Sequence, residues 1–209
     1  MWISKRGNAT EEVLITDQSA TLLRREEIAE GTMAFHFETP SGFSFGAVEF
    51  ADVPLTDPLK TGVNGNTRTF SIPHSPFASE LVFTTRMRDI AFSRSLKRVQ
   101  LTVEEKIGPA TCPFALHKDL DKPAICPVCG SVITPFLSMA QQADRDRRSQ
   151  HLSLLYSDRR PEDAAFLDTL KALEKINLNF SLIGNMTEIS KSKKSWKGHE
   201  CEEGKYVQS

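Results

Sequence analysis

The chain reads His151-Leu152-Ser153-Leu154-Leu155-Tyr156 and, one helix length further on, Phe180-Ser181-Leu182-Ile183-Gly184-Asn185-Met186. Both runs are short and apolar enough to be buried strands. Between them, residues 162–176 place apolar side chains at helical spacing, and Pro161 suits a helix start. An earlier apolar run at residues 124–129 is followed by a helix-like stretch at 135–147. Strands alternating with helices predict a parallel sheet of the nucleotide-binding type.

The first half of the chain has a different pattern of apolar and turn residues. Residues 33–39 and 81–87 alternate or are rich in β-formers, and Asn64-Gly65-Asn66 between them is a strong turn signal. Residues 90–98 are the one helical candidate here. This pattern predicts a small antiparallel β-barrel. We therefore expect an N-terminal extension at residues 1–19, a barrel domain at 20–118 and an α/β domain at 119–209, with a polar, loosely ordered end after Lys191.

Composition and charge exclude several classes of protein. The net charge is -1, from 26 basic and 27 acidic side chains, so no overall field favours nucleic acid or an anionic membrane. No stretch reaches the roughly 18 apolar residues of a membrane span, and the amino end lacks a signal-peptide run. We expect a cytoplasmic protein with no nucleic-acid partner.

Two of the four cysteines have a suggestive spacing. Cys126-Pro127-Val128-Cys129 resembles half of a zinc knuckle, in which two thiolates on a tight turn bind one ion. Completing the set would require Cys112, His199 and Cys201 to come together in the fold. The alternative, which we favour, is a pair of buried thiols at the end of a strand and no metal.

The stretch Arg68-Thr69-Phe70-Ser71 combines a cation, an aromatic ring and hydroxyl groups on one strand. Because side chains alternate faces, Arg68 and Phe70 point one way and Thr69 and Ser71 the other. Such a strand can pair Arg68 with a phosphate, lay Phe70 against a flat ring and offer a hydroxyl to a heteroatom. An ordinary half-buried edge strand has the same pattern.

Two loops of the second half suit a nucleotide. The turn Gly130-Ser131-Val132-Ile133-Thr134-Pro135 follows a strand and opens a helix, where unpaired N–H groups and the helix dipole attract phosphate. The loop from Tyr156 to Asp163 follows the next strand and carries Ser157, Arg159 and Arg160. Arginines at this position favour a 2′-phosphate. A solvated charged loop is the alternative.

These motifs, in this order, resemble the ferredoxin-NADP reductase-like family of FAD and NAD(P)H oxidoreductases. The resemblance runs from about Ala20 to Trp196, and it is strongest in residues 66–72, 83–89, 133–136 and 156–167. It implies an antiparallel β-barrel that binds FAD, followed by an α/β parallel-sheet domain that binds NADP or NAD. Electrons would pass as a hydride between nicotinamide and flavin, and then between flavin and an acceptor.

The resemblance also implies roles for the matched residues. Arg68 would contact the flavin pyrophosphate, Phe70 would stack on the isoalloxazine, and Ser71 would hydrogen-bond near N5 as the catalytic group, with Thr69 beside them. The strand along the flavin would contain Thr84, Thr85, Arg86 and Met87. The helix start over the pyrophosphate would contain Ala91, Phe92 and Ser93. In the second domain, Gly130 would lie at the nicotinamide dinucleotide's pyrophosphate, Thr134 near the nicotinamide, and Ser157, Arg159 and Arg160 near the adenosine phosphate.

The sequence departs from the family pattern at several places. Phe45-Gly46-Ala47-Val48-Glu49 replaces the usual Pro-Gly-Gln, and Gly108-Pro109-Ala110-Thr111 replaces Gly-Pro-x-Gly. Cys129-Gly130-Ser131-Val132 stands where the family has Gly-Gly-x-Gly, and a branched Val132 resists positive φ. Nothing after Trp196 matches the family's Cys-Gly-Pro segment. We therefore expect a degenerate pyrophosphate turn, a truncated NAD(P) domain and weakened dinucleotide binding.

The leading hypothesis is an FAD-dependent oxidoreductase that passes electrons between NAD(P)H and an acceptor, either a ferredoxin- or flavodoxin-like protein or a small molecule. A second hypothesis is a noncatalytic or vestigial flavin-binding module with an impaired nicotinamide site. A third is a zinc-knuckle protein with no redox role.

Overall fold

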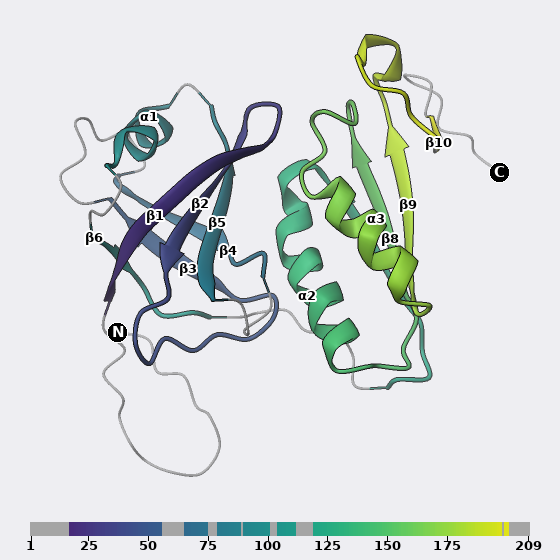
Figure 1. The fold of residues 1–209 in the computed structure, drawn as a ribbon, viewed down its shortest axis with the longest axis horizontal. Coiled ribbons are helices and arrows are strands. Elements are labelled where there is room, and N and C mark those ends of the chain that lie inside the picture. Colours follow the sequence, from purple (N-terminus) through teal and green to yellow (C-terminus); the bar gives the residue numbers. More distant parts are fainter. Residues whose placement is uncertain are drawn as a thin grey trace.

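Antiparallel strands fill the first half of the chain and a parallel sheet the second (Figure 1). The structure, a computed structural model, describes residues 17–55, 65–74, 79–88, 90–100, 104–111, 119–197 and 199–200. Within these ranges, no helix is both long and apolar enough to cross a bilayer. The two halves have separate hydrophobic cores.

The barrel is built from a four-stranded sheet and a two-stranded sheet. The four-stranded sheet has the order β5-β2-β1-β6, and the other pairs β3 with β4. Their bounds are β1 Gln18–Ala29, β2 Thr32–Glu38, β3 Phe50–Pro54, β4 Thr67–Ser71, β5 Glu80–Arg86 and β6 Glu104–Ile107, and helix α1 is Ala91–Arg98. The long strand β1 pairs with β6 at its start and with β2 from Leu22 onward, with irregular register on the way. Such irregularities bend a strand and help a sheet to curl.

Alternation explains the barrel core. In β2, Phe35 and Phe37 are buried, and their rings lie beside Leu81 and Phe83 of β5 in the core cluster. The rings of Phe37 and Phe83 meet edge to face at 5.8 Å, a favoured aromatic arrangement. Helix α1 closes one end of the barrel with Phe92 and Leu96. The antiparallel β-barrel expected from the sequence is therefore confirmed.

The second half is a parallel sheet with the order β10-β9-β8-β7. Its elements are β7 Ala124–Cys129, the 3-10 turn η1 Gly130–Val132, α2 Ile133–Arg145, β8 Leu152–Asp158, α3 Leu167–Ile176, β9 Phe180–Met186, η2 Ile189–Lys191 and β10 His199–Glu200. Figure 1 shows α2 and α3 on the side of the sheet that faces the barrel. The expected parallel α/β sheet is confirmed.

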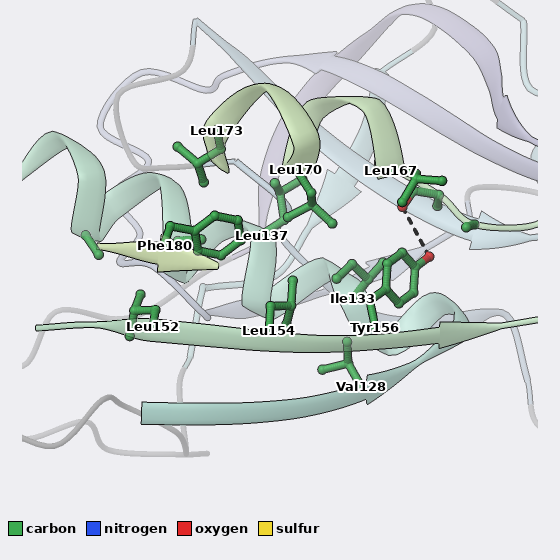
Figure 2. Close-up of a cluster of buried hydrophobic side chains, with 14 of the residues drawn as sticks. Val128, Ile133, Leu137, Leu152, Leu154, Tyr156, Leu167, Leu170, Leu173 and Phe180 are labelled. Carbon is green, nitrogen blue, oxygen red and sulfur yellow. Dashed lines mark hydrogen bonds between the residues drawn. The ribbon is translucent and has the colours of Figure 1, made fainter. Parts of the chain in front are cut away.

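The core of this half lies between the sheet and its two helices (Figure 2). Leu154 and Tyr156 of β8 point toward Ile133 and Leu137 of α2 and toward the leucines of α3. The Tyr156 hydroxyl donates a hydrogen bond of 3.1 Å to the carbonyl oxygen of Ala165. Burial, the main cause, raises the pKa of this phenol far above its ordinary value, so Tyr156 stays neutral.

Two expectations about the second half were wrong in detail. The helix predicted from Glu162 begins at Leu167, because Asp163 is held by the two preceding arginines and the chain then passes through Phe166 at a φ of 59°. The end of the chain is also not free of regular structure, since β10 pairs in parallel with β9 at Asn185 and Met186. A two-residue edge strand is held by backbone hydrogen bonds and needs no apolar run.

The segment before β10 packs against the sheet through Trp196. An ideal Cβ on Gly184 of β9 would lie 2.6 Å from a ring carbon of Trp196, so the indole requires glycine at this position. The ammonium of Lys171 lies 5.1 Å from the centre of a Trp196 ring. A cation over an indole face is attractive, and it adds to the packing that holds residues 192–197 on α3 and β9.

Candidate cofactor-binding site

Strand β4 places Arg68 and Phe70 against helix α1. The guanidinium carbon of Arg68 lies 4.9 Å from the centre of the Phe92 ring. The Phe70 ring lies 6.0 Å from Phe92 and 5.9 Å from Phe83. Ser71, also partly buried, ends β4 opposite Phe50. The structure thus brings together Arg68, Phe70 and Phe92, which the resemblance assigns to the flavin.

The amino end of α1 completes an anion-binding environment. Its first turn contains Ala91, Phe92 and Ser93, has no acidic side chain, and receives no side-chain cap from Ile90. The N–H groups of a first helical turn lack partners within the helix and favour a phosphate, as does a guanidinium. Arg68 Nη1 also donates to the Thr67 carbonyl oxygen at 2.6 Å. A flavin pyrophosphate fits this donor set, and Arg68 and the α1 backbone would hold it.

Strand β5 carries the next group of predicted residues along the inter-domain contact. Thr84 Oγ1 lies 3.3 Å from Thr134 Oγ1 at the start of α2. The Thr134 hydroxyl donates to the Ser131 carbonyl oxygen, so the proton between the two threonines comes from Thr84. Thr85 bonds within its own strand, and the Met87 N–H donates to Gly31. The structure therefore brings Thr84 and Thr134, from the two predicted cofactor sites, into direct contact.

The turn between β7 and α2 differs from the sequence expectation in its backbone. Gly130 has a φ of 56°, which glycine adopts without strain, whereas Val132 has a φ of −68°. The argument that Val132 resists a positive φ was therefore wrong, because no positive φ is required there. Its side chain is exposed beside the turn. Val132 therefore differs from a glycine at this position only in the size of its side chain.

A buried carboxylate lies beside the same turn. Asp158, at the end of β8, accepts the Arg159 N–H at 2.8 Å through Oδ1. Its Oδ2 is buried and has no hydrogen-bond partner among the described residues, and it would lie 4.0 Å from an ideal Cβ on Gly130. Burial raises the pKa of Asp158, which Arg86 at 4.0 Å opposes. A negative side chain at this place fits a dinucleotide pyrophosphate poorly.

Arg159 and Arg160 follow the end of β8 as predicted, but they differ in their contacts and in their exposure to solvent. Arg160 donates to both carboxylate oxygens of Asp163, and it also contacts Glu30 of the barrel at 3.2 Å. Arg159 donates to Asp163 at 3.0 Å. The side chain of Arg160 is 18% exposed and that of Arg159 is 51% exposed. Arg159, near the partly buried Ser157, is therefore the better placed of the two for a phosphate.

The loop that replaces Pro-Gly-Gln is closed on itself. Glu49 Oε2 accepts the Gly46 N–H at 2.8 Å, so the acid caps its own loop. Val48 has a φ of 74°, an unusual value for a β-branched residue, and its N–H points to Ser138 Oγ of α2 at 3.4 Å. The Ser138 hydroxyl itself donates to the His74 carbonyl oxygen at 2.9 Å. This loop therefore joins the barrel to α2.

The two cysteines of the zinc-knuckle hypothesis lie on a straight strand, not on a tight turn. Cys126 and Cys129 are three positions apart in β7, so their side chains point to opposite faces of the sheet. Cys126 is partly buried, which raises the pKa of its thiol, and Cys129 is exposed. Two thiols on opposite faces cannot bind one ion. Cys112 and Cys201 lie outside the described residues.

Sequence reasoning missed the acidic partners of the site. Asp163 is buried, accepts from both arginines and lies 3.8 Å from Arg86 of β5. The hydrogen bond from Arg160 is the main reason that the pKa of Asp163 is lowered. The spacing Arg159-Arg160-x-x-Asp163 was a usable signal for the local pairing. Nothing in the sequence indicated the partners Arg86 and Glu30, which come from the other half of the chain.

An antiparallel barrel followed by a parallel α/β sheet is the fold of the ferredoxin-NADP reductase-like FAD and NAD(P) proteins. Solved structures of such proteins have the same fold as this chain. No family model and no curated protein matches the sequence. A ferredoxin NADP+ reductase from Neisseria gonorrhoeae with bound FAD and NADP has a TM-score of 0.72 at 21% identity, over 88% of this chain and 72% of that one.

Two further structures show the same similarity. Phthalate dioxygenase reductase, described as transferring electrons from pyridine nucleotides to a [2Fe-2S] centre, has a TM-score of 0.68 at 21% identity, over 86% of this chain. The CS-b5R domains of human Ncb5or in the NAD+ form reach 0.72 at 14% identity, over 90% of this chain. This chain spans 54% and 56% of those two chains. At these identities the similarity establishes the fold.

Proposed function

We propose that this protein is an FAD-dependent oxidoreductase of the cytoplasm that passes electrons between NAD(P)H and an acceptor. One observation carries the proposal: the Arg68 guanidinium lies over the Phe92 ring in the first turn of α1, to which Ile90 gives no side-chain cap. A cation beside the first turn of a helix suits a pyrophosphate. The aromatic Phe70 on the same strand suits a flat ring system.

The residues of the chain would bind and orient the two cofactors. Arg68 and the first turn of α1 would hold the FAD pyrophosphate, and Phe70 would lie against the isoalloxazine. Bound FAD supplies hydride and single-electron chemistry, which no side chain can provide. The Ser71 hydroxyl, at the end of β4, would donate a hydrogen bond near the flavin N5. Thr84, Thr85 and Arg86 of β5, and Met87 directly after it, would line the flavin.

On the nicotinamide side, we propose that Gly130 and the first turn of α2 approach the dinucleotide and that Arg159 meets an adenosine phosphate. The first turn of α2 has no acidic side chain. Arg160 would act at a distance by holding Asp163 and the loop after β8. The acceptor would be a ferredoxin- or flavodoxin-like protein or a small molecule.

Absorbance spectroscopy tests the proposal directly. The purified chain should bind FAD and become yellow, and NADPH or NADH added without oxygen should bleach the colour. A preparation that takes up no flavin from an excess of FAD would refute the proposal. A preparation that holds stoichiometric zinc and no flavin would refute it as well.

A second candidate is a flavin-binding module without nicotinamide-dependent activity. The observation in its favour is the buried, unpartnered Asp158 Oδ2 beside Gly130. A carboxylate at this turn repels a pyrophosphate. Under this alternative, flavin binds and dithionite bleaches it, but NADPH and NADH do not. The two nucleotides therefore decide between the first and second candidates.

A further inference from the structure

Strand β5 contacts both halves of the chain. Leu81 and Phe83 belong to the barrel core. Because side chains alternate along a strand, Thr84 and Arg86 point away from that core. In Figure 1, β5 lies on the side of the barrel that faces α2. The face of β5 that contains Thr84 and Arg86 is therefore turned toward the α/β half.

These two side chains contact the two elements that would hold the dinucleotide. Thr84 Oγ1 lies 3.3 Å from Thr134 Oγ1 in the first turn of α2. The Arg86 guanidinium lies 3.8 Å from Asp163, in the loop after β8, and 4.0 Å from Asp158, the last residue of β8. The strand that lines the flavin in our proposal therefore also touches the start of α2 and the end of β8.

The contact between the two threonines has a defined direction. The Thr134 hydroxyl donates to the Ser131 carbonyl oxygen at 3.0 Å, so the proton between the two hydroxyl groups comes from Thr84. Thr134 is 4% exposed and Thr84 is partly buried. A hydrogen bond in such surroundings is stronger than one in water. Loss of the Thr84 hydroxyl would remove the bond between the halves and leave the bond from Thr134 to Ser131, which belongs to the turn itself, in place.

The position of one half relative to the other matters for the proposed reaction. The reacting atoms of nicotinamide and flavin must lie about 3 to 3.5 Å apart and be aligned, and an error of about 1 Å can lower the rate about a hundredfold. In our proposal the barrel binds the flavin and the α/β half binds the nicotinamide. A hydrogen bond between the two halves, beside both sites, would fix this distance.

We propose that Thr84 is a positioning residue for hydride transfer. Its hydroxyl, through Thr134, holds the start of α2 against the flavin strand and so aligns the nicotinamide with the flavin. Arg86 supports the same alignment at the end of β8. The inference rests on the proposed function, and it adds a role that the Thr84 hydroxyl performs across the boundary between the halves and not on a cofactor.

Thr84→Val tests the inference, because valine keeps the branched shape that suits a strand and lacks the hydroxyl. Anaerobic stopped-flow reduction of the FAD-loaded chain by NAD(P)H should have a limiting rate at least about tenfold below that of the wild type. The FAD content and the NAD(P)H concentration that gives half of the limiting rate should stay unchanged, because the contacts to both cofactors remain. Thr84→Ser, which keeps the hydroxyl, should retain the wild-type rate.

A spectrum recorded without turnover gives a second readout. Saturating NADP+ or NAD+ added to the FAD-loaded chain should perturb the flavin absorbance where the two rings stack. This perturbation should be smaller in Thr84→Val than in the wild type. Thr169→Val is the matched control, because it makes the same substitution at an exposed position of α3 and should match the wild type in rate and in spectrum.

Other outcomes would overturn the proposal. Thr84→Val with the rate and spectrum of the wild type overturns it and leaves the proposed function standing, and so does an equal loss of rate in Thr84→Ser. A lower FAD content, or a raised half-maximal concentration with an unchanged limiting rate, assigns Thr84 to binding and overturns it as well. A wild-type chain that binds no FAD, or whose FAD neither nucleotide reduces, overturns the proposed function together with this inference. If Thr84→Val fails to fold by circular dichroism, Thr84→Ala replaces it with the same expected result.

Discussion

Arg160 holds Asp163 with two parallel hydrogen bonds, from Nε to Oδ2 at 2.8 Å and from Nη2 to Oδ1 at 3.0 Å. The same guanidinium reaches Glu30 of the β1–β2 hairpin at 3.2 Å, and the Glu30 N–H donates to the Glu162 carbonyl oxygen at 2.7 Å. One arginine therefore fixes the loop after β8 and joins it to the barrel. Paired, bidentate contacts of this kind are among the strongest in proteins.

Asp163→Ala should destabilise the protein by about 1 to 3 kcal/mol, because it removes a buried carboxylate that accepts hydrogen bonds from both Arg159 and Arg160. Urea denaturation followed by circular dichroism measures this loss. Asp168→Asn is the control, since Asp168 is exposed in the first turn of α3 and its loss should cost less than about 1 kcal/mol. Equal effects of the two variants would show that Arg160 gains little from Asp163.

Arg68→Ala should weaken FAD binding by about 1.5 to 3 kcal/mol, the typical loss for a charge-assisted contact to phosphate. Flavin fluorescence titration into the apoprotein measures the dissociation constant. Arg68→Lys should retain part of the affinity, because it keeps the charge but not the planar fork. Lys175→Ala, at the exposed end of α3, should retain all of it. Wild-type FAD affinity in Arg68→Ala would remove Arg68 from the site.

Ser71→Ala should slow reduction of bound flavin by NAD(P)H by at least about tenfold, while the FAD content stays normal. The reason is that a hydroxyl near N5 acts on the reaction and not on the pyrophosphate. Stopped-flow absorbance under anaerobic conditions separates the rate from the occupancy. Ser19→Ala, on the exposed side of β1, is a matched control. Loss of flavin from Ser71→Ala would assign Ser71 to binding instead.

Asp158→Asn should strengthen NAD(P)H binding several-fold, because it removes a negative charge beside the Gly130 turn. Val132→Gly should have a smaller effect, since Val132 already has a helical φ and its side chain points to solvent. Isothermal titration with NADPH and NADH compares the two variants. A larger gain from Val132→Gly than from Asp158→Asn would show that steric bulk, not charge, limits the turn.

Acid should destabilise the fold through His74. Burial is the main cause that lowers the pKa of His74 below its ordinary value of 6.5, and repulsion from His36 and Arg24 acts in the same direction while Glu80 opposes it. The unfolded chain therefore binds a proton at this site before the folded chain does, so stability falls as the pH drops below 6.5. Denaturant midpoints measured above and below this pH should differ less in His74→Gln than in the wild type.

The periodic segments of the chain were predictable, since each depends on residues close together in the sequence. Residues 90–98 and 180–186 match α1 and β9 almost to the residue, because apolar spacing and turn residues determine both. The start of α3 was not predictable, because Asp163 bonds Arg159 and Arg160 instead of entering the helix. The spacing of apolar residues does not show where side-chain hydrogen bonds compete with helix formation.

The sequence predicted which residues of the candidate site share a strand, but not the contacts between residues on different elements. Arg68 and Phe70 alternate on one strand, so their common face follows from the pleat. Their contact with Phe92 depends on how α1 closes the barrel, which is a tertiary property. The pairing of Thr84 with Thr134, fifty positions away, likewise follows from the docking of the two halves. The resemblance to a family placed Arg68 and Phe92 at one pyrophosphate, but neither it nor the local pattern predicted the contact between Thr84 and Thr134.

Trp196, resting on Gly184 beneath Lys171, gives the chain an internal optical reporter. The sequence has two tryptophans, so Trp2→Phe would leave the emission of Trp196 alone. Its wavelength and intensity would follow the docking of residues 192–197 onto β9. Bound flavin absorbs in the region where indole emits. The same signal would therefore register the arrival of the cofactor by energy transfer and let one fluorescence trace follow folding and loading together.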